Sequence, residues 1–216
     1  MVGELKNETQ NKADEYFVSQ ILAAGLTYDE PYFDKIFSHC LLRFGMKDAY
    51  LKVIYPVLVR IGLMWACDDL LPANEHFISN LFRQKFFTAI DALPPPPPES
   101  DCWILCLPEN EFHEIGLLFS YYLIRLSGNK VIYLGNNISL KSLVSVGKQI
   151  SYQNILFFLV HNALDKDTQE YLNELSKNFS GKNIYVAGDQ NFLNQFNKSK
   201  NISFISSVND LEQQLH

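Results

Sequence analysis

Cysteine, basic residues and long apolar runs are all scarce in this sequence of 216 residues, and each scarcity excludes a class of protein. Its four cysteines, Cys40, Cys67, Cys102 and Cys106, show neither the density of a disulfide framework nor the close pairing of a zinc site. We therefore expect reduced thiols that are buried as small apolar side chains. No stretch approaches about 18 uninterrupted apolar residues, and the N-terminus lacks the apolar core of a signal peptide, which predicts a cytoplasmic protein without a membrane span.

Positive charge is also limited, with 18 Lys and Arg against 24 Asp and Glu and a net charge of −6. Nucleic-acid binding depends on clustered basic residues, and the densest cluster here, Arg83-Gln84-Lys85, is predicted to be one solvated helical patch. We therefore expect no direct contact with DNA from this chain. The sequence has no Walker loop, no Gly-x-Gly-x-x-Gly and no evident pair of nucleophile and base. We predict that the chain is not an enzyme.

Hydrophobic residues, at 47% with 13% aromatics, are ample for packed cores, and an unbroken proline run divides them into two parts. Pro94 to Pro98 cannot donate backbone hydrogen bonds and should form extended polyproline II over roughly 15 Å. We predict a helical bundle at residues 1–93, a linker at 94–98 and a second domain at 99–216.

Before the prolines, apolar residues recur at helical spacing. They do so in four stretches, at 17–22, 32–41, 50–61 and 77–90. The first helix is expected to begin near Lys12. Asp14 and Asp29 are expected as first-turn or capping acids, Gly25 and Gly45 as stop signals, and Pro72 in the first turn of the last helix. Four amphipathic helices predict a four-helix bundle.

After the prolines, short β-rich runs alternate with helical stretches. Strands are expected at 102–107, 131–134, 154–160, 183–186 and 202–205, and helices near 113–127, 139–149, 167–178, 189–197 and 208–215. Strands that are apolar throughout predict a parallel sheet covered on both faces, and right-handed crossovers make it doubly wound. In such five-stranded sheets, ligands bind beyond the carboxyl ends of the strands.

The motif Glu-x-His-x-x-Gly follows the first predicted strand at Glu111, His113 and Gly116. A neutral imidazole can bind a metal through one ring nitrogen while a carboxylate holds the N–H of the other. A glycine lets a bulky ligand cross the backbone closely. Each residue type therefore suits a cobalamin contact, although a single loop histidine is more often a surface residue.

A second motif lies in the helical half, where Trp65 is separated by nine residues from Glu75-His76. Together with the proline linker and the Glu-x-His-x-x-Gly domain, this pattern resembles the cobalamin-binding effector region of MerR-family transcriptional regulators that respond to light or cobalamin. The resemblance spans nearly the whole chain. Taken singly, a tryptophan at a helix end is most often a core residue, and a glutamate in a first helical turn is stabilised by the helix dipole without a ligand.

The resemblance implies a Rossmann-like cobalamin-binding fold and a role for each motif residue. His113 is then the lower axial ligand of cobalt, Glu111 orients its ring, and Gly116 makes room for the displaced nucleotide tail. Gly188 is expected to let the corrin ring lie against backbone. The cofactor implied is adenosylcobalamin or methylcobalamin.

The same resemblance assigns the other face of the cofactor to the helical half. Trp65 would shield an adenosyl group, and Glu75 and His76 would be its polar contacts. Light-sensing relatives can carry a histidine where this chain has Ala66, so a light-driven exchange of ligand is not expected here.

Two features of the second half depart from the family pattern. Cobalamin domains usually carry Ser-x-Leu at the end of the third strand, but no serine occurs at 154–165, where His161 and Asn162 are the possible substitutes. A usual Gly-Gly pair is replaced by Ala187-Gly188.

Three functions remain open from the sequence. The preferred one is a cobalamin-binding sensor of a transcriptional regulator, expected to form a homo-oligomer and to reach DNA only through a winged-helix domain, for which no room precedes the first helix. The chain is then either a fragment of a longer regulator or a stand-alone sensor. The alternatives are a corrinoid protein that carries methyl groups for a methyltransferase and a degenerate interaction domain that has lost the cofactor.

Overall fold

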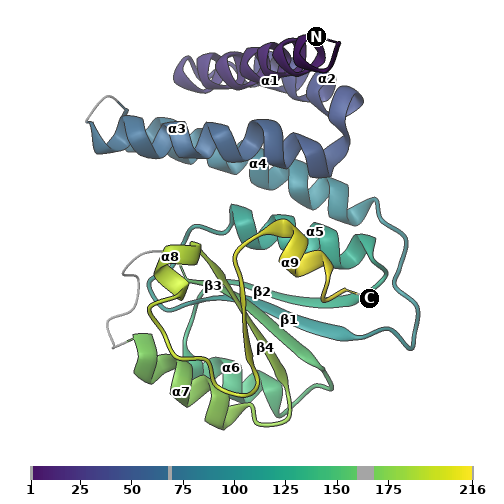
Figure 1. Ribbon diagram of the computed structural model, residues 1–216, viewed down its shortest axis with the longest axis vertical. Coiled ribbons are helices and arrows are strands. Elements are labelled where there is room, and N and C mark those ends of the chain that lie inside the picture. The colour runs from purple at the N-terminus through teal and green to yellow at the C-terminus, as the bar shows by residue number, and fades with distance from the viewer. Residues whose placement is uncertain (1, 68–69, 160–167, 216) are drawn as a thin grey trace. The chain divides into compact units, whose positions relative to one another are not determined.

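The computed structural model describes residues 2–67, 70–159 and 168–215, with side chains from residue 12 onward. The chain divides into two compact units, Met1–Ala89 and Ile90–His216. The first unit is helical and the second is built on one parallel sheet (Figure 1). This combination of a helical part and a doubly wound sheet confirms the predicted fold class.

The helical unit contains α1 (Val2–Leu26), α2 (Glu30–Ala49), a π-helical turn η1 (Tyr50–Ile54), α3 (Tyr55–Ala66) and α4 (Pro72–Asp91). The prediction that the first helix begins near Lys12 is wrong, because α1 begins at Val2. Apolar periodicity, which placed that start, is missing from the first eleven residues, although several of them, such as Glu4, Leu5 and Lys6, have good helix propensity.

Gly45, predicted as a stop signal, interrupts the helix with non-helical backbone. Its φ of 70° and ψ of 171° break α2 locally, and the helical stretch then continues through η1 into α3. Pro56 explains the π-turn, because it has no N–H to donate to Lys52. The preceding N–H, that of Tyr55, instead bonds the carbonyl oxygen of Tyr50, five residues back.

Two of the predicted helix boundaries are confirmed and one is wrong. Asp29 is the N-cap of α2, where its Oδ1 accepts a hydrogen bond from the N–H of Tyr32 at 2.9 Å. Pro72 is the first residue of α4. Asp14 caps nothing, because it lies inside α1.

Aromatic side chains from α2 and α4 form the centre of the helical unit. The rings of Phe33 and Phe37 stack at 5.8 Å between centroids, and Phe82 meets Phe33 edge-on at 5.4 Å. All three side chains are at most 1% exposed. Burial of this size is the main stabilising contribution to the unit.

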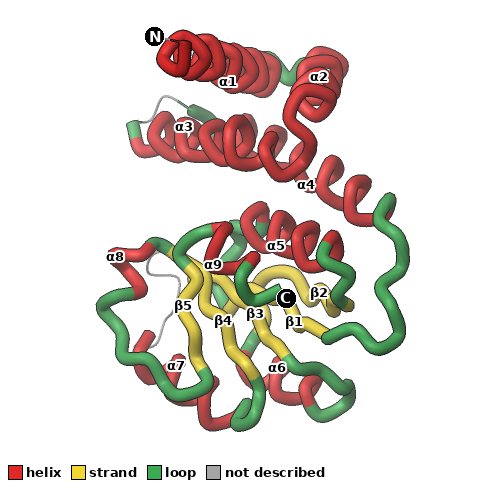
Figure 2. The backbone as a smooth tube through the Cα atoms, turned by 45° about the vertical axis from the view of Figure 1, so that its right-hand side comes forward, coloured by secondary structure: helices red, strands yellow, loops and turns green. Residues whose placement is uncertain are grey.

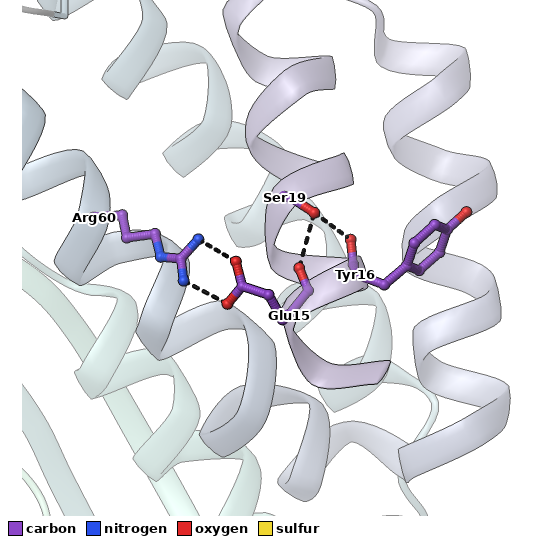
Figure 3. Close-up of polar contacts among 4 residues, drawn as sticks. All are labelled: Glu15, Tyr16, Ser19 and Arg60. Carbon is purple, nitrogen blue, oxygen red and sulfur yellow. Dashed lines mark hydrogen bonds and ion pairs between the residues drawn. The ribbon is translucent and has the colours of Figure 1, made fainter. Parts of the chain in front are cut away.

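At the surface, an ion pair joins α1 to α3. Two nitrogens of Arg60 donate to the two carboxylate oxygens of Glu15, at 2.7 Å and 2.5 Å, so the pair is bidentate (Figure 3). The carbonyl oxygens of Glu15 and Tyr16 accept hydrogen bonds from the Ser19 hydroxyl within α1. Because both charged side chains are about half exposed, solvent screens the ion pair.

The described part of the second unit contains five strands and five helices. The strands are β1 (Cys102–Pro108), β2 (Lys130–Ile138), β3 (Asn154–Leu159), β4 (Asn183–Gly188) and β5 (Ile202–Ile205). The helices are α5 (Ile115–Leu126), α6 (Leu140–Gly147), α7 (Thr168–Asn178), α8 (Gln190–Leu193) and α9 (Val208–Glu212). The strands lie in the order β2-β1-β3-β4-β5, and every pair is parallel.

Helices cover both faces of this sheet. Figures 1 and 2 show α5 and α9 on one face and α6 and α7 on the other. The α6 face holds a large buried cluster that includes Ile104, Phe157, Leu175 and Val186. Because side chains alternate along a strand, Phe158 points to the opposite face, where α5 packs on β1 and β3. The strand order reverses between β1 and β3, and this switch point is where doubly wound sheets bind ligands.

The proline run is attached to the second unit by hydrogen bonds to its carbonyl oxygens. Arg125 of α5 donates to the oxygen of Pro94 at 2.9 Å, and Lys130 of β2 donates to that of Pro98. Pro98 lies in a turn, closed by the N–H of Ser100 on the oxygen of Pro97. The predicted domain boundaries at 93 and 99 stay predictions.

Three of the four cysteines are buried, as expected, and Cys67 is exposed. None of the four is in a disulfide. Burial raises the pKa of the Cys40 thiol to about 12, which keeps it protonated and unreactive.

The helical stretch Glu30–Ala66 is long and apolar enough to cross a membrane when judged by length and composition alone. A single stretch of this kind is weak evidence, because core helices of soluble proteins pass the same test. Its inward face supplies buried residues of the helical unit, among them Phe33 and Val53.

Candidate functional site

Glu111 and His113 form a tight pair in the loop between β1 and α5. The Nδ1 atom of His113 lies 2.7 Å from Oε1 of Glu111, and the same oxygen accepts the backbone N–H groups of Phe112 and His113 at 2.8 Å each. The carboxylate is only 2% exposed, whereas the imidazole is 79% exposed. A carboxylate at Nδ1 keeps a proton on that atom, so the neutral ring carries its lone pair on Nε2.

The charge of Glu111 is stabilised in its buried position. Burial alone raises the pKa of this carboxyl, but the hydrogen bond from the His113 ring and those from the two backbone N–H groups outweigh it. The net effect holds the pKa of Glu111 below its ordinary value of 4.5. The carboxylate is therefore ionised at neutral pH and suited to orient the imidazole.

Neighbouring elements fix the loop that carries the pair. The carbonyl oxygen of Glu111 accepts a hydrogen bond from the backbone N–H of Asn137 at the end of β2. The side-chain oxygen of Asn137 in turn accepts a hydrogen bond from the backbone N–H of Asn110. The buried Glu114, at the N-cap of α5, accepts the hydroxyl of Tyr133 at 2.9 Å. Backbone and side-chain bonds from β2 thus place His113 at the carboxyl end of the sheet, beside the switch point.

The site offers one exposed imidazole rather than a cage of ligands. Among the described residues, no group of three or more His, Cys, Asp or Glu side chains could hold a metal ion. A metal bound through His113 would take its other ligands from outside the protein, as the cobalt of a corrin ring does. The Glu111 and His113 pair fits this requirement, because it presents a single oriented donor.

Gly116 has a different environment from the one expected for it. A Cβ built on Gly116 would lie 2.8 Å from Cε1 of Phe158, closer than real Cβ contacts come. The glycine therefore allows the first turn of α5 to pack against the Phe158 ring of β3. Phe158 was not predicted as a site residue from the sequence. Alternation along the strand, starting from the buried Phe157, places Phe158 on the α5 face.

Gly188, the other glycine expected near the corrin ring, lies at the end of β4. A Cβ there would lie 2.7 Å from the carbonyl oxygen of Leu159, so close approach of β3 and β4 requires glycine. The preceding Ala187 is 4% exposed and pairs with Phe158 in the sheet. The suggested serine substitutes His161 and Asn162 lie outside the described residues.

The helical unit carries Trp65, Glu75 and His76. They lie where α3 ends and the next helix, α4, begins. Trp65 is in the last turn of α3 and is 60% exposed, which is unusual for a tryptophan. Glu75 and His76 are in the first turn of α4, with Nδ1 of His76 3.2 Å from Oε2 of Glu75. Ser79 donates to the other carboxylate oxygen at 2.6 Å, which fixes Glu75 in place.

The helical unit is similar to a known protein family. Residues 13–89 match the family model described as the B12 binding domain, a range that includes Trp65, Glu75 and His76. Residues 13–89 are similar to this family, and the range is named the B12 binding domain after this match. This match and the relative described next confirm the resemblance to a cobalamin-binding effector region.

A curated relative extends the similarity beyond the B12 binding domain. The HTH-type transcriptional repressor CarH of Myxococcus xanthus is 29% identical over 129 residues, which cover 60% of this chain. The match spans 42% of the repressor, so this chain corresponds to less than half of that protein's length.

A solved structure matches the B12 binding domain together with the α/β unit. The monomethylamine corrinoid protein of Methanosarcina barkeri has a TM-score of 0.71, and the match covers 94% of this chain and 98% of that chain. At 12% identity, this similarity establishes the fold only. The comparisons together support a cobalamin-binding domain and a corrinoid cofactor.

Proposed function

We propose that this chain is the cobalamin-sensing part of a cytoplasmic transcriptional regulator, with the cofactor bound through His113. The observation that carries the proposal is the buried, ionised Glu111, which holds Nδ1 of an exposed imidazole at the carboxyl end of a doubly wound sheet. Bound cobalamin supplies the cobalt and an exchangeable upper ligand. The chain's own residues supply one oriented nitrogen donor and hold its proton on Nδ1.

The exposed Trp65 favours sensing over a second candidate, a corrinoid methyl carrier. In our proposal, Trp65 covers a bulky upper ligand, and Glu75 and His76 bind its polar groups. A methyl carrier must instead present a small upper ligand to partner enzymes, and a large exposed tryptophan does not suit that task. The similarity to a transcriptional repressor supports the same choice. The adenosyl form is therefore preferred to the methyl form.

Sensing requires that the cofactor bind one state of the protein more tightly than another. We propose that the bound form differs from the free form in its self-association, and that DNA is contacted by a part of the regulator outside this sequence. Methyl transfer from the bound corrinoid to a thiol or folate, in the presence of candidate methyltransferases, would favour the carrier instead.

The decisive experiment is spectroscopic. We expect the purified chain, incubated with adenosylcobalamin in the dark and desalted, to retain the corrin absorption. His113→Ala should shift the bands that report the lower axial ligand and weaken binding by about tenfold or more, since a direct ligand contributes at least as much as its supporting groups.

His39→Ala is the matched control, because His39 is an exposed histidine on α2, far in sequence from the motif. It should leave both the spectrum and the affinity unchanged. A colourless wild-type protein after desalting would overturn the proposal and leave the degenerate interaction domain. An unchanged spectrum in His113→Ala would remove His113 as the ligand while keeping the cofactor.

A further inference from the structure

The ring of Phe158 occupies the space next to Gly116, three residues beyond His113. A Cβ on Gly116 would meet Cε1 of Phe158 at 2.8 Å and two further ring atoms at 3.4 Å. Even one methyl group therefore does not fit between the first turn of α5 and the end of β3 while the ring stays in place. A ligand group larger than a methyl cannot enter there without displacing Phe158.

The strand beside Phe158 adds no room. Ala187 pairs with Phe158 across β3 and β4, and it is 4% exposed. On the α5 face, among the residues that the structure describes, Phe158 and Ala187 therefore lie side by side at this end of the sheet, with the Phe158 ring against Gly116.

This packing matters because of a general property of cobalt ligation. The lower axial position holds one ligand, so an imidazole that takes it leaves the nucleotide base of cobalamin without its bond to the metal. The displaced base must then be buried elsewhere or remain in solvent. In this chain, the ring of Phe158 already fills the space beside Gly116.

We infer that Phe158 determines corrinoid specificity by excluding the lower nucleotide from the sheet, so that this chain binds a corrinoid through its ring and cobalt alone. The inference rests on the proposed function, because it assumes that His113 binds cobalt. The nucleotide then adds no affinity. Cobinamide, which is a corrinoid without the nucleotide, should bind at least as tightly as cobalamin, since it has no base to displace from the metal.

The test compares aquocobinamide with hydroxocobalamin by equilibrium dialysis against the full chain. For the wild type, cobinamide should bind at least as tightly as cobalamin. Phe158→Ala opens the space beside Gly116 and should raise cobalamin affinity by about tenfold or more, because a planar base can then be buried there. Cobinamide affinity should stay within about twofold, so that the change is specific to the nucleotide.

Two further variants keep the test interpretable. Phe204→Ala, in the edge strand β5, removes the same side chain from a partly buried position and should change neither affinity. Phe158→Leu retains apolar volume in case the alanine variant fails to fold, as circular dichroism would show, and should shift the preference in the same direction by less.

Two outcomes would overturn the specificity role. One is a wild-type protein that binds cobalamin about tenfold or more tightly than cobinamide, which would mean that Phe158 moves and the nucleotide is buried. The other is a set of Phe158 variants that leave the ratio of the two affinities unchanged. Failure of wild type to bind either corrinoid would instead overturn the proposed function.

Discussion

At the scale of single residues, one oxygen atom organises the candidate site. Oε1 of Glu111 accepts hydrogen bonds from the ring Nδ1 of His113 and from the backbone N–H groups of Phe112 and His113. The two backbone bonds fix the carboxylate in the loop, and the fixed carboxylate then orients the imidazole. The contact is local, because a single residue separates Glu111 from His113 in the sequence, and the role of the pair toward a metal stays a prediction.

Glu111→Gln tests whether this orientation contributes to binding. The amide keeps the size of the side chain but loses its charge, so Nδ1 of His113 is held less firmly and the ring is a weaker donor. We expect corrinoid affinity to fall by about 10–100-fold, as is usual when a group supporting a metal ligand is removed. Affinity is measured by absorbance titration with hydroxocobalamin.

Glu109→Gln is the control for that variant, since Glu109 is an exposed carboxylate just after β1. It should bind as the wild type does. A Glu111→Gln protein with wild-type affinity would show that the loop backbone alone positions His113.

At the scale of elements, the sequence predicted the α/β unit better than the helical unit. Strands such as β1 and β5 were placed within a residue of their observed ends, because apolar runs bounded by polar residues mark strand ends sharply. Gly45 was predicted to stop a helix, and its non-helical backbone does interrupt α2, although the helical stretch resumes directly after it. Phe158 was missed because its effect depends on Gly116, 42 positions earlier in the sequence.

The ion pair between α1 and α3 leads to a prediction on pH and stability. The hydrogen bond from Arg60 lowers the pKa of Glu15 from its ordinary value of 4.5. A lowered pKa in the folded state means that the stabilisation is complete above about pH 4.5 and is lost as pH falls through the folded value. At neutral pH, Glu15→Gln should lower the free energy of unfolding by about 0.2–1 kcal/mol, because both side chains are exposed.

Urea denaturation followed by helical ellipticity measures this difference, which should disappear near about pH 3 and shrink in high salt. Arg60→Gln completes a double-mutant cycle, which isolates the interaction of the two side chains from their separate effects. Additive losses in the double variant, or a difference that persists in acid, would show that the bidentate geometry in Figure 3 contributes no net stability.

At the scale of the whole molecule, the protein consists of two units, each of which carries residues that the proposed function assigns to the cofactor. The α/β unit carries His113, which we propose as the metal donor, and the helical unit carries Trp65, Glu75 and His76. The fold of each unit was predictable from periodicity, which changes at the proline run. Cooperation of the two units on one cofactor stays a prediction, because neither apolar pattern nor strand order encodes a cofactor.

Trp65→Ala tests that cooperation through the choice of upper ligand. If Trp65 covers an adenosyl group, its loss should weaken binding of adenosylcobalamin by about tenfold, since an aromatic contact of this size is removed. Hydroxocobalamin, whose upper ligand is small, should bind within about twofold of its wild-type affinity. Trp65→Phe should recover part of the loss, and Leu42→Ala, which removes an 85% exposed apolar side chain of α2, should change neither affinity.

Fluorescence provides an independent measurement on the same proteins. The other tryptophan, Trp103, is 1% exposed and stacks on Tyr185 inside the α/β unit, so Trp65 accounts for the solvent-sensitive emission. Adenosylcobalamin should protect that emission from acrylamide quenching in the wild type, whereas cobinamide should protect it less. Equal losses of both cobalamin affinities in Trp65→Ala would indicate that this side chain supports the fold of the B12 binding domain and does not select the upper ligand.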